Sequence, residues 1–165
     1  MSAPTLPAFL PVLWKGLQPV LRVLAQTALR IALATPFFFS GLTKWNGFLN
    51  LSDSAISLFT DEFRIHWFGA EIPFPAPHVM AFASGCAEIL LPILLVLGLG
   101  TRFAALGLLG MTAIIQLTAP EGWASFHQIW AATALAIIAY GPGPISLDAI
   151  LGRLGLYPAP APLKA

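Results

Sequence analysis

Four polar side chains stand out because each is set in a long apolar stretch: Lys44, Glu88, Gln116 and His127. An ammonium, a carboxylate, an amide and an imidazole can together hydrogen-bond the head group of a small molecule, and the carboxylate or the imidazole can move protons. Ionisable residues within membrane-embedded segments mark functional sites by default. The same four groups can instead pair with one another and fix the register of packed helices. The sequence leaves both interpretations open.

Other kinds of site find little support in the sequence. No nucleophile–base arrangement, phosphate-binding loop or paired carboxylates can be recognised, so no catalytic residue is predicted. No His or acidic residues have metal-ligand spacing, and Cys86 is the single cysteine, which excludes an intrachain disulfide or a thiolate zinc site. Flavin, haem and iron–sulfur motifs are also missing, so no intrinsic cofactor is predicted. A net charge of +1 without basic runs argues against a nucleic-acid partner.

Glu88 lies near the middle of the apolar stretch 79–100, where it is the only charge. A stretch of this length spans a bilayer as a helix, since a hydrocarbon core of roughly 30 Å needs about 20 residues. Pro92 has no N–H, so the Glu88 carbonyl loses its helical partner. Small residues share the Glu88 face and let another helix approach closely. These are Ala81, Ser84 and Gly85.

The composition is that of a membrane protein: 58% of the residues are hydrophobic and 9% are charged, against about 25% charged in soluble domains. We expect an all-α integral membrane protein, an antiparallel bundle of four transmembrane helices with short amphipathic surface helices. The spans are predicted at about 23–45, 79–98, 103–119 and 123–141, and the transmembrane domain at 23–145.

Three other segments are predicted around the spans. Residues 1–22 form an interfacial N-terminal segment with Trp14 and Lys15. Residues 46–78 form an outer surface segment with a short helix that starts near Ser52. Residues 146–165 begin with an amphipathic helix capped by Ser146 and end in an unordered tail.

Basic residues give the expected orientation. Lys15, Arg22, Arg102, Arg153 and Lys164 fall on one side, which the positive-inside rule makes cytoplasmic, so both termini are predicted to be cytoplasmic. Counting depth along the helices then places all four polar side chains in the outer half of the bundle.

Arg30 and Lys44 lie on one face of the first span and bracket Glu88 in depth. One of them is expected to pair with the carboxylate. A ligand head group, if one binds, is expected between Glu88, Gln116 and His127. Its tail would pass Phe37, Phe38 or Trp130.

Six short motifs resemble the DoxX family of four-helix membrane proteins, in the expected order over roughly residues 25 to 150. They are Leu29-Arg30-Ile31, Phe39-Ser40-Gly41-Leu42-Thr43-Lys44-Trp45, Ile72-Pro73-Phe74-Pro75, Ala87-Glu88-Ile89-Leu90, Leu97-Gly98-Leu99-Gly100-Thr101-Arg102 and Gly141-Pro142-Gly143-Pro144-Ile145-Ser146-Leu147-Asp148. The resemblance implies a multi-pass protein of the bacterial inner membrane. It also marks Arg30, Lys44, Glu88, Arg102 and Asp148 as ion-pair candidates.

The resemblance further implies a redox-related role. The first hypothesis is a non-catalytic membrane subunit or scaffold that docks a redox partner through Asn46 to Pro77. A homo-oligomer is a separate hypothesis. The alternative is a quinone-binding subunit of an oxidoreductase that acts on a quinone, such as a thiosulfate:quinone oxidoreductase. A small-molecule transporter is a weaker alternative. Relatives that handle disulfides use cysteine pairs, and this chain has one cysteine.

Overall fold

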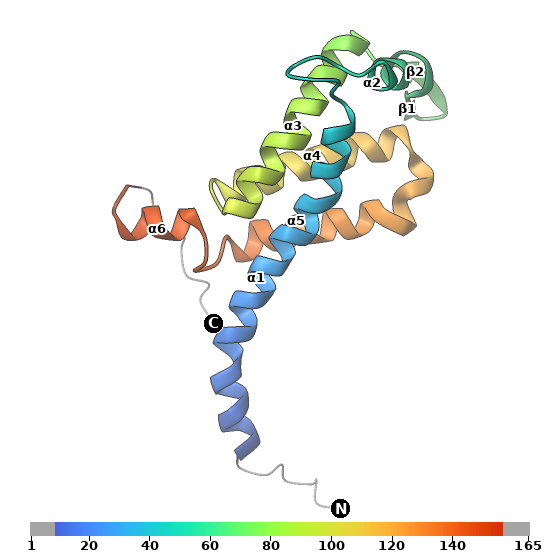
Figure 1. The fold of residues 1–165 in the computed structure, drawn as a ribbon. Helices are drawn as coiled ribbons and strands as arrows, with labels where there is room; N and C mark the ends of the chain where they lie inside the picture. Colours follow the sequence, from blue (N-terminus) through green and yellow to red (C-terminus); the bar gives the residue numbers. More distant parts are fainter. Residues whose placement is uncertain (1–8, 157–165) are drawn as a thin grey trace, which may run out of the picture.

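The computed structural model describes residues 9–156 and is mostly helical (Figure 1). Its main elements, in chain order, are α1 (Phe9–Thr43), α2 (Asp53–Ser57), β1 (Arg64–Trp67), β2 (Ala70–Pro73), α3 (Pro77–Leu97), α4 (Thr101–Thr118), α5 (Gln128–Tyr140) and α6 (Leu147–Arg153). Short π-helical turns at Leu58–Glu62 and Trp123–His127 and a 3₁₀ turn at Pro120–Gly122 complete the described chain. The predicted unordered tail, from Tyr157 onward, lies outside these residues.

Three helices among the described residues are long and apolar enough to cross a membrane: Leu13–Thr43, Pro77–Leu97 and Thr101–Thr118. The fourth predicted span divides into the π-helical turn Trp123–His127 and α5. At 1.5 Å per residue α5 is about 20 Å long, shorter than the roughly 30 Å hydrocarbon core. A bundle of four spans therefore stays a prediction, while three membrane-length helices are a finding.

Helix α1 is much longer than the span predicted for it. It contains 35 residues, which corresponds to about 52 Å, and it takes in most of the segment expected to be a separate interfacial lead-in. Figure 1 shows this N-terminal part of α1 (blue) extending beyond the other helices. Its apolar side chains, among them Leu13, Trp14 and Leu24, are exposed. Pro19 and Pro36 both lie inside the helix.

Small residues set the closest helix contacts. A Cβ on Gly41 of α1 would come within 2.9 Å of the Glu88 backbone in α3, and one on Gly85 would come within 2.7 Å of the Trp45 ring. A Cβ on Gly107 of α4 would lie 2.8 Å from the Leu91 side chain. The residues buried between α1, α3, α4 and α5 form one core, which includes Leu33, Phe37, Leu95, Leu108 and Ile137.

The segment between α1 and α3 contains a β-hairpin that the all-helical prediction did not include. Ser52 caps α2 by accepting a hydrogen bond from the Ala55 N–H, as its position predicts. Strands β1 and β2 then pair antiparallel with Ile65 opposite Ile72. The turn between them is Phe68-Gly69, and both residues have positive φ. We call the end of the bundle that carries this segment the hairpin end; α2, β1 and β2 gather there beside the start of α3 (Figure 1).

Helix α6 is held against the opposite end of the bundle by polar contacts. Ser146 caps it by accepting from the Ala149 N–H. The Asp148 N–H donates to the Gly98 carbonyl oxygen. The Asp148 carboxylate accepts from the N–H groups of Gly100 and Thr101 at 2.8 and 2.9 Å and from the Thr101 hydroxyl at 2.8 Å. Asp148 thus satisfies the first N–H groups of α4, which lack partners within their own helix.

Candidate ligand pocket

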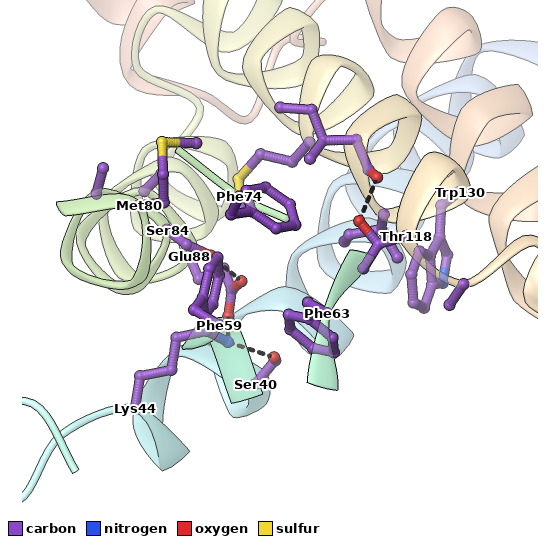
Figure 2. Close-up of a pocket in the computed structure, with 16 residues that line it drawn as sticks. Ser40, Lys44, Phe59, Phe63, Phe74, Met80, Ser84, Glu88, Thr118 and Trp130 are labelled. Carbon is purple, nitrogen blue, oxygen red and sulfur yellow. Dashed lines mark hydrogen bonds and ion pairs between the residues drawn. The ribbon is translucent and has the colours of Figure 1, made fainter. Parts of the chain in front are cut away.

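A cavity of about 400 Å³ lies at the hairpin end of the bundle (Figure 2). Helices α1, α3, α4 and α5 and the 46–76 segment all contribute to its wall. The lining residues are Ser40, Lys44, Phe59, Phe63, Phe74, Met80, Ala83, Ser84, Ala87, Glu88, Met111, Ile114, Ile115, Thr118, Ala119 and Trp130. Pockets for small organic ligands usually have about 300–1,000 Å³ and are mostly apolar with a few placed polar groups. This cavity has both properties.

Lys44 and Glu88 form a buried ion pair in the cavity wall. Lys44 Nζ lies 2.6 Å from Glu88 Oε2, and the two residues are 8% and 4% exposed. Each partner has a second contact, since Lys44 Nζ donates to Ser40 Oγ at 3.2 Å and Glu88 Oε1 accepts from Ser84 Oγ at 2.8 Å. Of the two cations that the sequence offered to Glu88, the structure therefore selects Lys44.

The helix contacts explain why these two side chains meet. Gly41 allows the backbone of α1 to touch α3 at Glu88, and Lys44 follows about one turn later, directly after the last residue of α1. Lys44 N–H donates to the Gly41 carbonyl as the helix ends. The ammonium group thus comes from the residue directly after α1, while the carboxylate comes from the middle of α3. Figure 2 shows Lys44, Ser84 and Glu88 on one side of the cavity and Thr118 and Trp130 on the other.

Aromatic side chains from the 46–76 segment close the hairpin end of the cavity. Phe59 lies on the π-helical turn Leu58–Glu62, Phe63 follows that turn directly, and Phe74 precedes α3. The ring centroid of Phe59 lies 5.2 Å from that of Phe63 and 5.4 Å from that of Phe74, and both pairs are near edge-to-face. Phe59 and Phe74 are buried and share a small core with Ala81. These three rings, which we call the aromatic roof, were not among the predicted site residues, although the i, i+4 spacing of Phe59 and Phe63 is visible in the sequence.

Gln116 and His127 do not line this cavity, contrary to the single four-residue site that the sequence suggested. His127 Nδ1 lies 2.7 Å from Gln116 Oε1, and Gln116 Nε2 donates to the Pro120 carbonyl at 3.2 Å. The residues of α4 that face the cavity are Met111, Ile114, Ile115 and Thr118, and Gln116 projects from a different side of the helix. Trp130 lies between the two groups, because it lines the cavity and its ring centroid is 5.4 Å from that of His127.

The remaining predicted ion-pair residues lie at the opposite end and do not form ion pairs among the described residues. Arg30 is 2% exposed and donates to the carbonyl oxygens of Val96 and Ile145. Asp148 accepts hydrogen bonds from the start of α4, as described above. Arg102 is exposed and lies near Gly141, where an added Cβ would be 3.4 Å from its guanidinium. These residues join helix ends rather than build a ligand site.

Within residues 9–156 no group of three or more His, Cys, Asp or Glu side chains is arranged to hold a metal ion. Cys86 is a free thiol and is half-buried. The polar groups that line the cavity are the Ser40, Ser84 and Thr118 hydroxyls, the Lys44 ammonium and the Glu88 carboxylate.

Comparison with known proteins decides the family. Residues 25–121 match the DoxX family, a range that includes every residue of the cavity up to Ala119. This chain belongs to the DoxX family. The DoxX protein is also 33% identical over 160 residues to an uncharacterized protein of Haemophilus influenzae, an alignment that covers 82% of this chain and 87% of the relative. No solved structure matches it. Family membership and the apolar helices establish a multi-pass membrane protein.

Proposed function

We propose that this DoxX protein is a non-catalytic membrane subunit of a redox-related assembly and that its cavity binds the ring of a quinone-like molecule. The observation that supports this most directly is the combination of a buried Lys44–Glu88 pair with aromatic walls around one cavity. A bound quinone would supply two-electron, two-proton redox chemistry. The chain's own residues would hold the ring and offer a hydrogen bond to its oxygen.

The residues present fit such a ring. An ammonium group has three N–H donors, and Lys44 directs two of them to Glu88 and Ser40, leaving one for a carbonyl oxygen in the cavity. The opposing charges of Lys44 and Glu88 cancel, so a neutral ligand needs no further counter-charge. Phe59, Phe63 and Trp130 offer ring faces and edges for stacking.

Binding of a short-tailed benzoquinone to purified protein tests the proposal. Lys44→Met removes the donor, and we expect a loss of affinity of about tenfold to 150-fold, since a charge-assisted hydrogen bond contributes about 1.5–3 kcal/mol. His127→Asn is the matched control, because His127 is buried and hydrogen-bonded but lies outside the cavity. Equal affinities in wild type and Lys44→Met would exclude the proposed site, and a selective loss in His127→Asn would move it to the Gln116–His127 pair.

A second candidate is a scaffold that docks a redox protein through residues 46–77. The observation in its favour is that Phe48 and Phe68 are 94% and 95% exposed in this segment, which makes both rings available to a partner protein. Purification of wild type and of Phe48→Ser/Phe68→Ser from native membranes tests it. A stoichiometric redox protein that is lost in the variant would support the scaffold, whereas identical preparations would argue against it.

We also propose that the protein lies in the bacterial inner membrane with both termini cytoplasmic, which puts the hairpin end outside. The distribution of Lys and Arg supports this orientation. Single cysteines at Asp61 and Lys164 in a Cys86→Ala background test it with a membrane-impermeant thiol reagent. Labelling of Asp61→Cys alone in intact cells would support the orientation. Labelling of Lys164→Cys alone would show the opposite orientation.

A further inference from the structure

The cavity reaches the lateral surface of the bundle between α3 and α4. Ala83 and Ala87 line it from α3, and Met111 and Ile114 line it from α4. Three residues that line the cavity are exposed, Ser40, Ala83 and Ile114, the last at 47%. Two of these three come from α3 and α4. We call this opening, bounded by Ala83, Ala87, Met111 and Ile114, the α3–α4 mouth.

The separation of the two helices explains the mouth. At the end away from the hairpin, α3 and α4 are joined by the short connection Gly98–Gly100, and Gly107 packs against Leu91 so closely that a Cβ would lie 2.8 Å from Leu91 Cδ1. Ala83 lies about 12 Å further along α3, and Ile114 lies about 10 Å further along α4. Both of these residues line the cavity. The two helices touch near their connection and leave a gap toward the hairpin end.

The chemistry of the mouth differs from that of the cavity interior. All four residues of the mouth are apolar, while Lys44 and Glu88 lie in the interior on the α1 side. Both α3 and α4 are long and apolar enough to span a membrane, and the mouth lies within their length. We therefore expect lipid acyl chains rather than water around it.

We propose that the α3–α4 mouth is the passage through which a ligand enters from the bilayer, and that the ligand's apolar tail stays in the mouth while its polar ring reaches Lys44. This inference rests on the proposed function and specifies its ligand class: a neutral amphipathic molecule with a hydrogen-bond acceptor on a ring and an apolar tail. On the route that the sequence suggested, past Phe37, Phe38 or Trp130, the rings of Phe37 and Trp130 pack together at 5.1 Å and Phe37 is buried.

The side chains at the mouth suit a tail that passes between them. Ala83 and Ala87 are four residues apart and lie one above the other on α3, so they form a smooth strip without branched side chains. Met111 faces them from α4 and has three rotatable bonds, which lets it adapt to different occupants. A larger side chain on the alanine strip would occupy the space of the tail without touching Lys44 or Glu88.

Two benzoquinones with the same ring, one with a ten-carbon tail and one without a tail, test the passage in nanodiscs. In Ala83→Leu we expect the tailed compound to lose about tenfold in affinity, which equals the burial of about two methylene groups, and the tailless compound to keep its affinity. Ala113→Leu is the matched control, since Ala113 is an exposed alanine of α4 that does not line the cavity. An equal loss for both compounds, or no loss for either, would overturn the passage.

A measurement without any quinone separates the passage from the proposed function. A nitroxide on Ala83→Cys, in a Cys86→Ala background, reports which solvent reaches the mouth. Collisions with oxygen and not with a water-soluble nickel chelate would support an opening to the bilayer, and the reverse would overturn it. If neither quinone binds the wild type, the proposed function fails by that result, and the nitroxide result still decides where the cavity opens.

Discussion

Gly41 on α1 and Glu88 on α3 touch through their backbones, since a Cβ on Gly41 would come within 2.9 Å of both the carbonyl carbon and the Cβ of Glu88. Two main chains cannot yield as a flexible side chain can. We expect Gly41→Ala to force α1 and α3 apart and to lower the free energy of unfolding by about 1–3 kcal/mol, as overpacking of a tight contact does. Thermal unfolding in detergent measures this loss.

Gly110→Ala is the control for that substitution. Gly110 is also inside a helix, but an added Cβ would meet nothing within 4 Å. Alanine has the higher helix propensity by about 1 kcal/mol, so this variant should be as stable as wild type or more stable. If both variants lose the same stability, the α1–α3 contact is looser than the structure has it.

The Lys44–Glu88 pair gives a second prediction. Glu88→Gln leaves a buried ammonium without its counter-charge, and we expect a loss of about 3–5 kcal/mol in the free energy of unfolding. Lys44→Met combined with Glu88→Leu removes both charges and should recover most of this loss, since apolar pairs often replace buried ion pairs at little cost. Thermal unfolding of the single and double variants provides the measurement.

The exposed pair of His66 and Glu71 is the internal comparison for this experiment. His66 Nε2 lies 3.7 Å from Glu71 Oε1, and both side chains are well exposed. Glu71→Gln should change stability by less than about 1 kcal/mol. Similar losses in Glu71→Gln and Glu88→Gln would show that Glu88 is not shielded from water.

Gly98 and Gly100 allow the contact with Arg30 to be measured separately from backbone strain. Both have positive φ, +69° and +55°, and a left-handed conformation costs an L-residue about 1–2 kcal/mol. A Cβ on Gly98 would also collide with the Arg30 guanidinium and lie 2.5 Å from Ser146 Cβ, whereas one on Gly100 would meet nothing. Gly98→Ala should therefore melt well below Gly100→Ala. Equal melting temperatures would mean that Arg30 moves aside freely.

Asp148 is predicted to hold α6 on the bundle. Asp148→Ala leaves the N–H groups of Gly100 and Thr101 and the Thr101 hydroxyl without their acceptor. Each buried group left unsatisfied costs about 1–3 kcal/mol, so α6 should detach and trypsin should cut faster at Arg153. Asp53→Ala, which removes an exposed first-turn aspartate from α2, should leave the cleavage rate unchanged. A rate in Asp148→Ala equal to wild type would contradict the role of Asp148.

The starts of several helices could be predicted from the sequence, because proline and serine each have a specific effect at a helix N-terminus. Pro77 begins α3 because a missing N–H costs nothing in a first turn, and Ser52 and Ser146 cap the helices that follow them. Of the small residues on the Glu88 face, Gly85 packs closely against the ring of Trp45, which follows α1. The 46–76 hairpin was missed because its strands are four residues each, too short for a clear alternation.

The candidate site was less predictable than the helices around it. Depth along a helix placed Lys44, Glu88, Gln116 and His127 at similar levels, but rotation about each helix axis and the distances between helices decide which side chains meet. Those depend on contacts such as Gly41 with Glu88, which no single segment contains. The aromatic roof was missed for a related reason, since Phe59, Phe63 and Phe74 converge only once the chain between α1 and α3 has folded.

The spread of the cavity's walls along the chain has a consequence for how the protein is made. Lys44 leaves the ribosome before Glu88, and Trp130 leaves last, because synthesis proceeds from the N-terminus. The Lys44 ammonium follows the end of α1 and can stay near the lipid head groups before α3 is inserted. Glu88, in the middle of the apolar helix α3, must be carried into the bilayer. The order of synthesis thus lets the carboxylate be inserted beside a cation already in place. A chain arrested before α5 would hold this pair and lack one wall of the cavity.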